Sequence, residues 1–406
     1  MGELAGARTA GPSLLRLGLT LGLLSVLGPI SIDLYLPAFP TIAQELAASP
    51  SDVQRTLSVF FLALALAQIP IGAFGDRYGR KPTLLIGLAL FVGASIACAL
   101  AADIGSLLAL RFVQGLGVCA GTAVSRAIIR DLRTGHEAAR LMAVSFLIIG
   151  LSPIVAPLFG SLLLTLLPWR GLFLLLAALG VAALALVHFG LPESLPRERR
   201  VRKGTAILPG IVGPLRDARF LSGAVVAGLA TTIPFAYVTA APFVYTGIFG
   251  LDARSYSLLL ALNAVCSIGS TQLSPGLMRR WGPRNVLVRI SLAGALLTGV
   301  AGLLLVSGQL NLILFQVYSM LLFALAGLLL TPAAISAMDS GKGGAGAAAG
   351  MLGALQLVVV AITSAAVSVF PTFSLAPLIG VLGSALLLAW LLSLTRPQPI
   401  DRARHD

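Results

Sequence analysis

Long apolar runs, separated by short polar stretches, recur along the whole chain and constrain its fold more than any other feature. A helix needs roughly 20 consecutive apolar residues to cross the hydrocarbon core of a bilayer. Only 11% of the 406 residues are charged, which is less than half the share of about 25% in soluble domains. We therefore expect an all-α membrane protein with twelve transmembrane helices. The twelve runs cover residues 14–37, 56–75, 82–101, 106–128, 139–165, 169–191, 219–246, 255–278, 285–306, 310–337, 346–369 and 374–394.

A polar break at residues 192–218 divides the runs six and six. It holds several arginines and four prolines, and prolines disfavour one continuous helix. The sequence Arg-Tyr-Gly at 77–79 recurs as Arg-Trp-Gly at 280–282, after the second run of each half. Basic loops with a glycine turn are common at helix ends, but the matched position favours a duplicated architecture. We predict two pseudo-symmetric six-helix bundles, 1–191 and 219–406, an arrangement typical of transporters.

The net charge of +13 would suit a nucleic-acid partner if the cations formed one patch, but they lie between apolar runs. With both termini placed inside, 24 of the 28 Lys and Arg fall in the tails and inside loops. Because such residues are retained on the cytoplasmic side, we expect cytoplasmic termini and no nucleic-acid partner. The three cysteines lie within apolar runs, and no metal-ligand spacing or phosphate-binding glycine loop is present. We expect no cofactor, no metal and no enzymatic activity.

One acid and one base lie well inside the predicted spans, Asp33 in the first run and Arg111 in the fourth. Burying either alone costs about 2.5–3.5 kcal/mol, so such residues usually mark transport pathways. Asp33 lies roughly 6 Å and Arg111 roughly 7.5 Å from the outer end of its span, which allows them to share one level. We expect Asp33 to accept the transported proton or to recognise a cation, with Arg111 tuning its pKa. The alternative is a static buried ion pair that holds the two spans together.

Residues 72–81, between the second and third runs, resemble the signature loop of the major facilitator superfamily. The residues that carry this resemblance are Gly72, Asp76, Arg77, Gly79 and Arg80. Glycines permit a tight turn, and Asp76 can pair with the surrounding cations. The resemblance implies a gating role that holds the two halves together on the cytoplasmic side, without substrate contact. In the second half Arg279 stands in the place of Asp76, which argues against a symmetric latch.

Two helix motifs extend the resemblance. Residues 111–117, Arg-Phe-Val-Gln-Gly-Leu-Gly, resemble the superfamily's basic motif in its fourth helix. Residues 150–160 resemble, loosely, the glycine–proline motif of antiporters in the superfamily. The residues of that motif are Gly150, Pro153, Pro157 and Gly160. The prolines also have an ordinary interpretation, because membrane helices tolerate proline and kink there.

The end of the first run narrows the resemblance to one branch. Residues 32–40, Ile-Asp-Leu-Tyr-Leu-Pro-Ala-Phe-Pro, resemble the end of helix 1 in the bicyclomycin- and chloramphenicol-resistance (Bcr/CflA) branch of drug–proton antiporters. Residues 241–245, Ala-Pro-Phe-Val-Tyr, resemble its helix 7, and Leu262-Asn263 resembles its helix 8. The likeness covers nearly the whole chain and implies the major facilitator fold with drug–proton antiport.

Candidate substrate contacts combine apolar bulk with hydrogen-bonding groups, as ligand sites commonly do. They are Tyr35, Phe60, Gln114, Tyr237, Asn263 and Gln356. Each of these residues also has an ordinary interpretation as a packing residue.

The sequence therefore predicts a proton-coupled multidrug efflux transporter, a monomer in a bacterial inner membrane that exports small amphipathic drug-like compounds by alternating access. Its expected partners are the substrate, protons and membrane lipid. One alternative is a major facilitator that moves a metabolite such as a sugar or an amino acid, which would call for more polar side chains in the cavity. A non-transporting receptor is a second alternative, but it has no evident use for Asp33 and Arg111 inside the membrane.

Overall fold

The chain is helical throughout the part that the structure, a computed structural model, describes. That part comprises residues 14–133, 135–201, 215–338, 345–369 and 374–395, without the side chains of 14–16, 135, 136, 139, 219 and 345–348. It contains no strand. Eleven helices in these ranges are long and apolar enough to cross a membrane, or twelve when one bent pair counts as a single span. The expected all-α membrane protein is confirmed.

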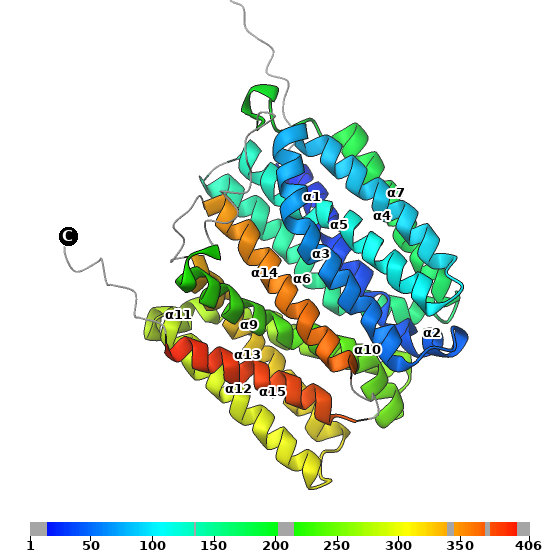
Figure 1. Ribbon diagram of the computed structural model, residues 1–406, viewed down its shortest axis with the longest axis vertical. Helices are drawn as coiled ribbons and strands as arrows, with labels where there is room; N and C mark the ends of the chain where they lie inside the picture. Colours follow the sequence, from blue (N-terminus) through cyan, green and yellow to red (C-terminus); the bar gives the residue numbers. More distant parts are fainter. Residues whose placement is uncertain (1–13, 134, 202–214, 339–344, 370–373, 396–406) are drawn as a thin grey trace, which may run out of the picture.

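The helices of the two halves lie in separate regions of Figure 1, blue to green for the first half and green to red for the second. The first half contains α1 (Leu14–Asp33), η1 (Leu36–Ala38), α2 (Phe39–Glu45), α3 (Pro50–Tyr78), α4 (Arg80–Ala99), α5 (Ile104–Leu132), α6 (Gly135–Leu163) and α7 (Trp169–Gly190). A short turn, η2 (Arg197–Arg199), follows. The second half contains α9 (Ala218–Phe243), η3 (Val244–Ile248), α10 (Ala253–Thr271), α11 (Ser274–Trp281), α12 (Pro283–Val306), α13 (Leu312–Met338), α14 (Ala345–Val369) and α15 (Ala376–Leu394).

Helix packing is dense within each half and concentrated on two helix pairs between them. In the first half α5 packs against α1, α3 and α4, and α6 packs against α1. In the second half α9 packs against α13, α14 and α15. Across the halves α3 lies beside α14, as Figure 1 shows, and α6 contacts α10. The space between the halves is therefore flanked by α3–α14 and α6–α10.

Polar side chains cap the N-termini of several helices by accepting hydrogen bonds from backbone N–H groups of the first turn. Asp103 caps α5 by accepting from the Ser106 amide at 2.9 Å, and Asp252 caps α10 in the same way through Ser255. Such caps satisfy donors that have no partner within the helix.

Hydrogen bonds from the Ser106 backbone hold the pKa of the Asp103 carboxyl below its usual range. Hydrogen bonds from Ser255 likewise lower the pKa of Asp252.

The predicted loop at 76–81 is almost entirely helical, which corrects its expected extent. Helix α3 continues to Tyr78, α4 begins at Arg80, and Gly79 alone joins them with φ at +109°. Gly282 joins α11 to α12 in the second half with φ at +77°. Glycine adopts positive φ without the steric penalty that side chains bring. The recurring tripeptide thus makes the same kind of helix junction in both halves.

The expected span at 255–278 is broken near its C-terminal end. Helix α10 ends at Thr271, and α11 leaves its direction by 41° before ending at Trp281. Of the expected connector, residues 192–201 lie against the first half, whereas residues 202–214 lie outside the described part. The division into bundles at 191 and 219 stays a prediction. We call the side that carries Gly79 and residues 192–201 the connector side, and the side that carries α2 the far side.

Candidate functional site

Asp33 lies at the end of α1, where its carboxylate is buried and bound to a single side chain. Ser152 of α6 donates a hydrogen bond from Oγ to Asp33 Oδ2 at 2.9 Å. Only 7% of Asp33 is exposed, and no ion pair to it occurs among the described residues. Ser152 was not singled out from the sequence, although it stands within the glycine–proline motif, directly before Pro153.

Arg111 lies on α5 and is completely buried. Its Nη1 donates to the Ser31 carbonyl oxygen of α1 at 3.2 Å and to Gln114 Oε1 at 2.5 Å. Gln114 in turn donates from Nε2 to Ser95 Oγ on α4 at 2.7 Å. Arg111 Nε and Nη2 have no hydrogen-bond partner within the described structure. The guanidinium therefore joins three helices while part of its donor set stays free.

Aromatic rings occupy the space around this guanidinium. The Arg111 Cζ atom lies 4.3 Å from the ring centre of Phe60, 4.7 Å from that of Tyr35 and 5.8 Å from that of Phe173. A cation over an aromatic face is attracted by the ring quadrupole, by about 2 kcal/mol where water is excluded. Tyr35 also shares a hydrogen bond with Thr56 at 3.1 Å. Three of the predicted contacts, Tyr35, Phe60 and Gln114, are thus gathered around Arg111.

No ion pair or hydrogen bond joins Asp33 and Arg111 in the described structure, and the expectation that Arg111 tunes the pKa of Asp33 stays a prediction. Arg111 meets α1 at the Ser31 carbonyl, whereas Asp33 faces α6 through Ser152. The static ion pair that was the alternative is likewise absent from the described residues. Spacing along the sequence gives the depth of a residue in the membrane but not its direction around the helix. Helix α1 presents the Ser31 carbonyl to α5 and the Asp33 carboxylate to α6.

Two of the three predicted contacts of the second half, Tyr237 and Asn263, belong to a separate buried network. Tyr237 and Tyr245 share a hydrogen bond at 2.6 Å, and Tyr245 donates to Gln316 Oε1 at 2.5 Å. Gln316 Nε2 donates to Asn263 Oδ1 at 3.0 Å, and Ser319 Oγ reaches the same oxygen at 3.4 Å. Gln316 and Ser319 were missed from the sequence because they stand singly in an apolar run. Tyr237, Tyr245, Asn263 and Ser319 are fully buried.

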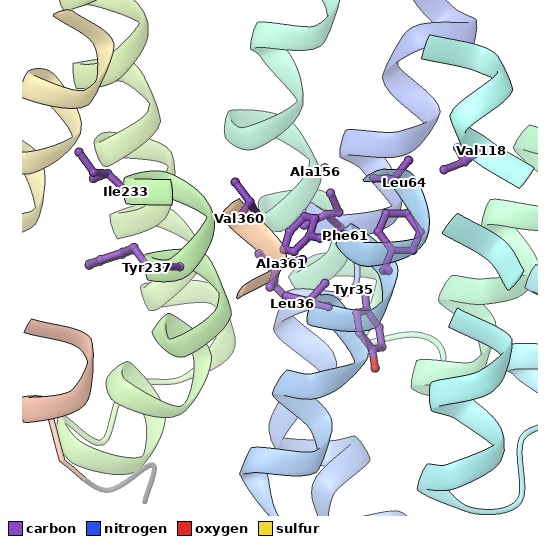
Figure 2. Close-up of a cluster of buried hydrophobic side chains, with 14 of the residues drawn as sticks. Tyr35, Leu36, Phe61, Leu64, Val118, Ala156, Ile233, Tyr237, Val360 and Ala361 are labelled. Atoms are coloured by element: carbon purple, nitrogen blue, oxygen red, sulfur yellow. The ribbon is translucent and has the colours of Figure 1, made fainter. Parts of the chain in front are cut away.

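The two groups of predicted contacts are separated by packed apolar side chains. Figure 2 shows Phe61 of α3 with Val360 and Ala361 of α14 between Tyr35 and Tyr237. Tyr237 points away from this contact, toward the interior of the second half. Gln356, one turn before Val360 on α14, is half-buried. No hydrogen bond or ring contact among the described residues joins the two groups, so this conformation does not form the single expected site.

Hydroxyl groups and aromatic rings join the two halves toward the far side. Ser58 Oγ of α3 donates to Ser364 Oγ of α14 at 3.1 Å, and Thr239 of α9 shares a hydrogen bond with Ser364 at 2.9 Å. All three hydroxyl-bearing residues are buried. The rings of Phe61 and Phe235 meet edge to face with centres 5.1 Å apart. The halves are therefore closed against each other at this level.

The signature residues near Gly79 bind the first half and the connector. Arg80 pairs with Asp76 at 2.7 Å and with Asp131 of α5 at 2.8 Å. Glu193 accepts hydrogen bonds from the backbone N–H groups of Arg80 and Lys81, at 2.9 and 3.3 Å. This carboxylate caps α4, whose own N-cap residue is a glycine without a side chain. Among the described residues, no hydrogen bond or ion pair joins residues 76–81 to the second half.

Helix α6 runs unbroken from Gly135 to Leu163 through Pro153 and Pro157. Gly160 touches α1 so closely that a Cβ there would lie 2.5 Å from the Leu34 carbonyl oxygen. Gly150 lies toward the second half, 3.9 Å by the same measure from Ile268 of α10. The motif thus places α6 against both the end of α1 and the opposite bundle. No group of three or more metal-binding side chains occurs in the described ranges.

Comparisons with known proteins identify relatives across most of the chain. A family profile described as Major Facilitator Superfamily matches residues 21–364. The uncharacterized transporter YdgK of Bacillus subtilis is 33% identical over 370 residues, which cover 89% of this chain and 90% of YdgK. A bicyclomycin resistance protein homolog of Haemophilus influenzae is 31% identical, with coverage of 91% and 93%.

Two further comparisons concern drug resistance and fold. Multidrug resistance protein MdtL of Escherichia coli is 32% identical over 269 residues, covering 65% of this chain and 67% of MdtL. The crystal structure of a D-xylose–proton symporter superposes with a TM-score of 0.73 over 94% of this chain and 97% of that one. At 17% identity this second likeness concerns the fold alone.

Proposed function

Because the chain belongs to the Major Facilitator Superfamily, we propose that it exports small amphipathic compounds, antibiotics among them, in exchange for protons. The resemblance to the Bcr/CflA branch is confirmed by the bicyclomycin resistance and multidrug resistance relatives. The observation that carries the proposal is Asp33, a buried carboxyl group whose partner is one hydroxyl and which pairs with no cation among the described residues.

Asp33 is the proton carrier in this proposal. A charged carboxylate inside a membrane is costly, and binding a proton removes that charge. Ser152 can donate to the ionised group, and its oxygen can accept from the protonated group, so the same contact serves both forms. Because no arginine of the described part of the chain is paired with Asp33, proton uptake there breaks no ion pair. The proton can therefore load or leave when the surrounding helices open to water.

Arg111 supplies a fixed positive charge within the first half. Its hydrogen bonds to Ser31 and Gln114 and its stacking on Phe60 and Tyr35 hold it in place. The two unpartnered nitrogens remain available to a polar group of a substrate or to water. Substrate contact at Tyr35, Phe60 and Gln114 requires the packed apolar layer between the halves to separate. Contact at Tyr237 and Asn263 would further require their buried network in the second half to open, whereas Gln356 is already half-buried on α14.

Alternating access accounts for the contacts between the halves. The hydrogen bond between Ser58 and Ser364 helps to close the far side and must break when the transporter opens there. The segment from Gly72 to Arg80 acts in gating on the connector side, where Asp76 and Arg80 are positioned by Asp131 and Glu193. Arg77 lies beside them on the last turn of α3.

The proposal also assigns the orientation of the protein in the membrane. The connector side faces the cytoplasm of a bacterial cell, in keeping with the concentration of Lys and Arg there. Both termini are then cytoplasmic, and the protein is a monomer in the inner membrane. Exposed apolar side chains such as Leu147 and Phe189 contact lipid.

Replacing Asp33 tests the coupling. In a bacterial host without its own drug pumps, the parent chain is expected to raise resistance to a panel of antibiotics, and an uncoupler is expected to abolish that resistance. Asp33→Asn keeps the size and a hydrogen-bond acceptor for Ser152 but cannot exchange a proton. We expect this variant to insert normally and to lose efflux driven by a pH gradient in proteoliposomes.

Asp103→Asn serves as the matched control, because Asp103 is an exposed carboxylate at a helix end. It should transport as the parent does. Undiminished proton-driven efflux by Asp33→Asn would refute the assignment of the proton carrier. A host that gains no resistance to any compound, yet accumulates a metabolite, would favour a metabolite transporter instead.

A further inference from the structure

A second arginine, Arg126, lies inside a spanning helix and is exposed. It stands near the end of the apolar run 106–128 and was counted with the inside cations, but α5 continues to Leu132. Arg126 stands six residues before that end, which is roughly 9 Å at 1.5 Å per residue. Arg130, one turn further on, is the other exposed residue of this final third of α5. An ionisable side chain at such a depth marks a functional site by default.

Arg126 has no anionic partner in the described structure. Two other arginines of this region are paired, Arg80 with Asp131 and Arg133 with Glu137 at 3.1 Å, whereas Arg130, like Arg126, has no ion pair among the described residues. Neither an ion pair nor a hydrogen bond to the Arg126 side chain occurs among the described residues. Its positive charge is therefore available to a molecule that enters from the connector side.

The direction of Arg126 follows from the neighbours of α5. Cys119, seven residues earlier, donates to Gln68 Oε1 of α3 at 3.4 Å. Thr122, four residues earlier, approaches α1, with its methyl carbon 3.9 Å from where a Cβ on Gly28 would lie. Residues four and seven apart lie on one face of a helix. Arg126 accordingly lies on the face of α5 between α3 and α1, away from α4.

An apolar surface of α1 lies at the connector end of the same half. Leu19 and Leu23 are 45% and 49% exposed. They cannot face α6, which Gly18 and Gly22 contact, and they lie on a different side from Leu24, which meets α5. One turn deeper, Val26 is only 5% exposed. Near the connector side the first half thus exposes apolar side chains on α1 and a cation on α5.

The charges further along this path have the same sign. Arg111 is buried with two free nitrogens, and Asp33 is the one acid that lies deep within a described span. When Asp33 carries its proton, only the arginine charges remain. Guanidinium groups bind carboxylates through paired hydrogen bonds, more strongly than they bind neutral acceptors.

From this arrangement we propose that the exported compounds are amphipathic anions, molecules with an apolar body and a carboxylate, and that Arg126 is the residue that first binds the acidic group. The proposal rests on the export function proposed above and specifies its substrate class. Leu19 and Leu23 accept the apolar body while Arg126 holds the charge. The protonated state of Asp33 then favours passage of the anion toward Arg111.

The test compares acidic with neutral and cationic compounds in the pump-deficient host and in proteoliposomes made from phosphatidylcholine. The probes are nalidixic acid and fusidic acid, each with a carboxylate, together with neutral chloramphenicol and the cation ethidium. We expect the parent chain to export the acids. Arg126→Gln should raise the apparent KM for the acids by about tenfold and leave any transport of the other probes unchanged. Arg126→Lys, which keeps the charge, should retain most of the acid transport.

Arg130→Gln is the matched control, since it removes an exposed cation from the same helix one turn away. It should transport the acids as the parent does. Export of chloramphenicol or ethidium but of neither acid would overturn the anion proposal and leave the export function standing. Equal acid transport by Arg126→Gln and the parent would also overturn it, as expected if Arg126 binds a lipid phosphate instead. Transport of none of the four probes would count against the export function itself.

Discussion

The hydroxyl contact between the halves offers a direct way to shift the conformational equilibrium. Ser364→Ala removes the oxygen that Ser58 binds across the halves and that Thr239 binds within the second half. Thr239 keeps a second hydrogen bond to the Phe235 carbonyl at 2.8 Å, but no other hydrogen bond is described for Ser58. The change therefore leaves one buried hydroxyl unpaired in the closed form.

The expected magnitude follows from that single unpaired group. An unsatisfied buried donor or acceptor costs about 1–3 kcal/mol. When the far side opens, Ser58 reaches water, so the cost applies to the closed form alone. The ratio of open to closed molecules should rise by about 5- to 150-fold, the range that corresponds to this free energy.

Distances between spin labels on the two halves report this ratio. Gln44 of α2 and Arg254 of α10 are exposed on the far side and suit labelling after substitution by cysteine. The native cysteines are replaced by alanine beforehand. Ser364→Ala should add a population with longer distances between the labels.

Thr363→Ala is the matched control for this measurement. It removes a hydroxyl from the adjacent position on α14, whose partner, Thr232 at 3.1 Å, lies in the same half. The distance distribution of this control should match the parent. A Ser364→Ala distribution identical to that of the parent would show that the hydroxyl contact does not hold the far side closed.

Two further predictions concern helix packing and acid stability. Gly117→Ala should lower the thermal stability in detergent by about 1–3 kcal/mol through overpacking, because the new Cβ would lie 2.6 Å from the Phe91 backbone nitrogen. Gly93→Ala is the control, because its Cβ would meet nothing within 4 Å and should leave the stability unchanged. Equal melting temperatures of the two variants would refute the packing argument. Hydrogen bonds from Ser106 lower the pKa of Asp103 in the folded state. The ionised carboxylate therefore stabilises the fold above the unfolded-state pKa, and this stabilisation is lost as the pH falls through the folded-state pKa. Asp103→Asn should flatten the acid limb of a profile of melting temperature against pH, and a variant profile parallel to the parent's at every pH would contradict this.

Much of the fold follows from the apolar runs alone. Twenty apolar residues leave a helix few alternatives in a bilayer, since every backbone group must be satisfied within the segment. The ends of helices were harder to predict, because α3 and α5 carry charged residues on their last turns and continue past them. Asp76 of α3 and Asp131 of α5 each pair with Arg80, so their charges do not end a helix as the hydropathy pattern suggests.

The candidate site was predicted less completely. Asp33 and Arg111 stand out because a charge in an apolar run is conspicuous, and both are buried as expected. Their partners depend on direction around the helix axis, which one sequence does not reveal for α1 and α6. Ser152, Gln316 and Ser319 are uncharged and common in membrane helices, so their hydrogen bonds emerge only from the packing.

The surroundings of Arg111 also bear on the order in which the chain can be assembled. Its contacts come from Ser31 on α1, Phe60 on α3 and Phe173 on α7. Phe173 is synthesised 62 positions after the arginine, which follows from the numbering of the two residues. Until α7 emerges, the guanidinium has an open side within the bilayer or the insertion machinery. The contacts of Arg111 are therefore complete only once α7 is in place, and a nascent chain that stops after α5 lacks the ring of Phe173 beside the charge.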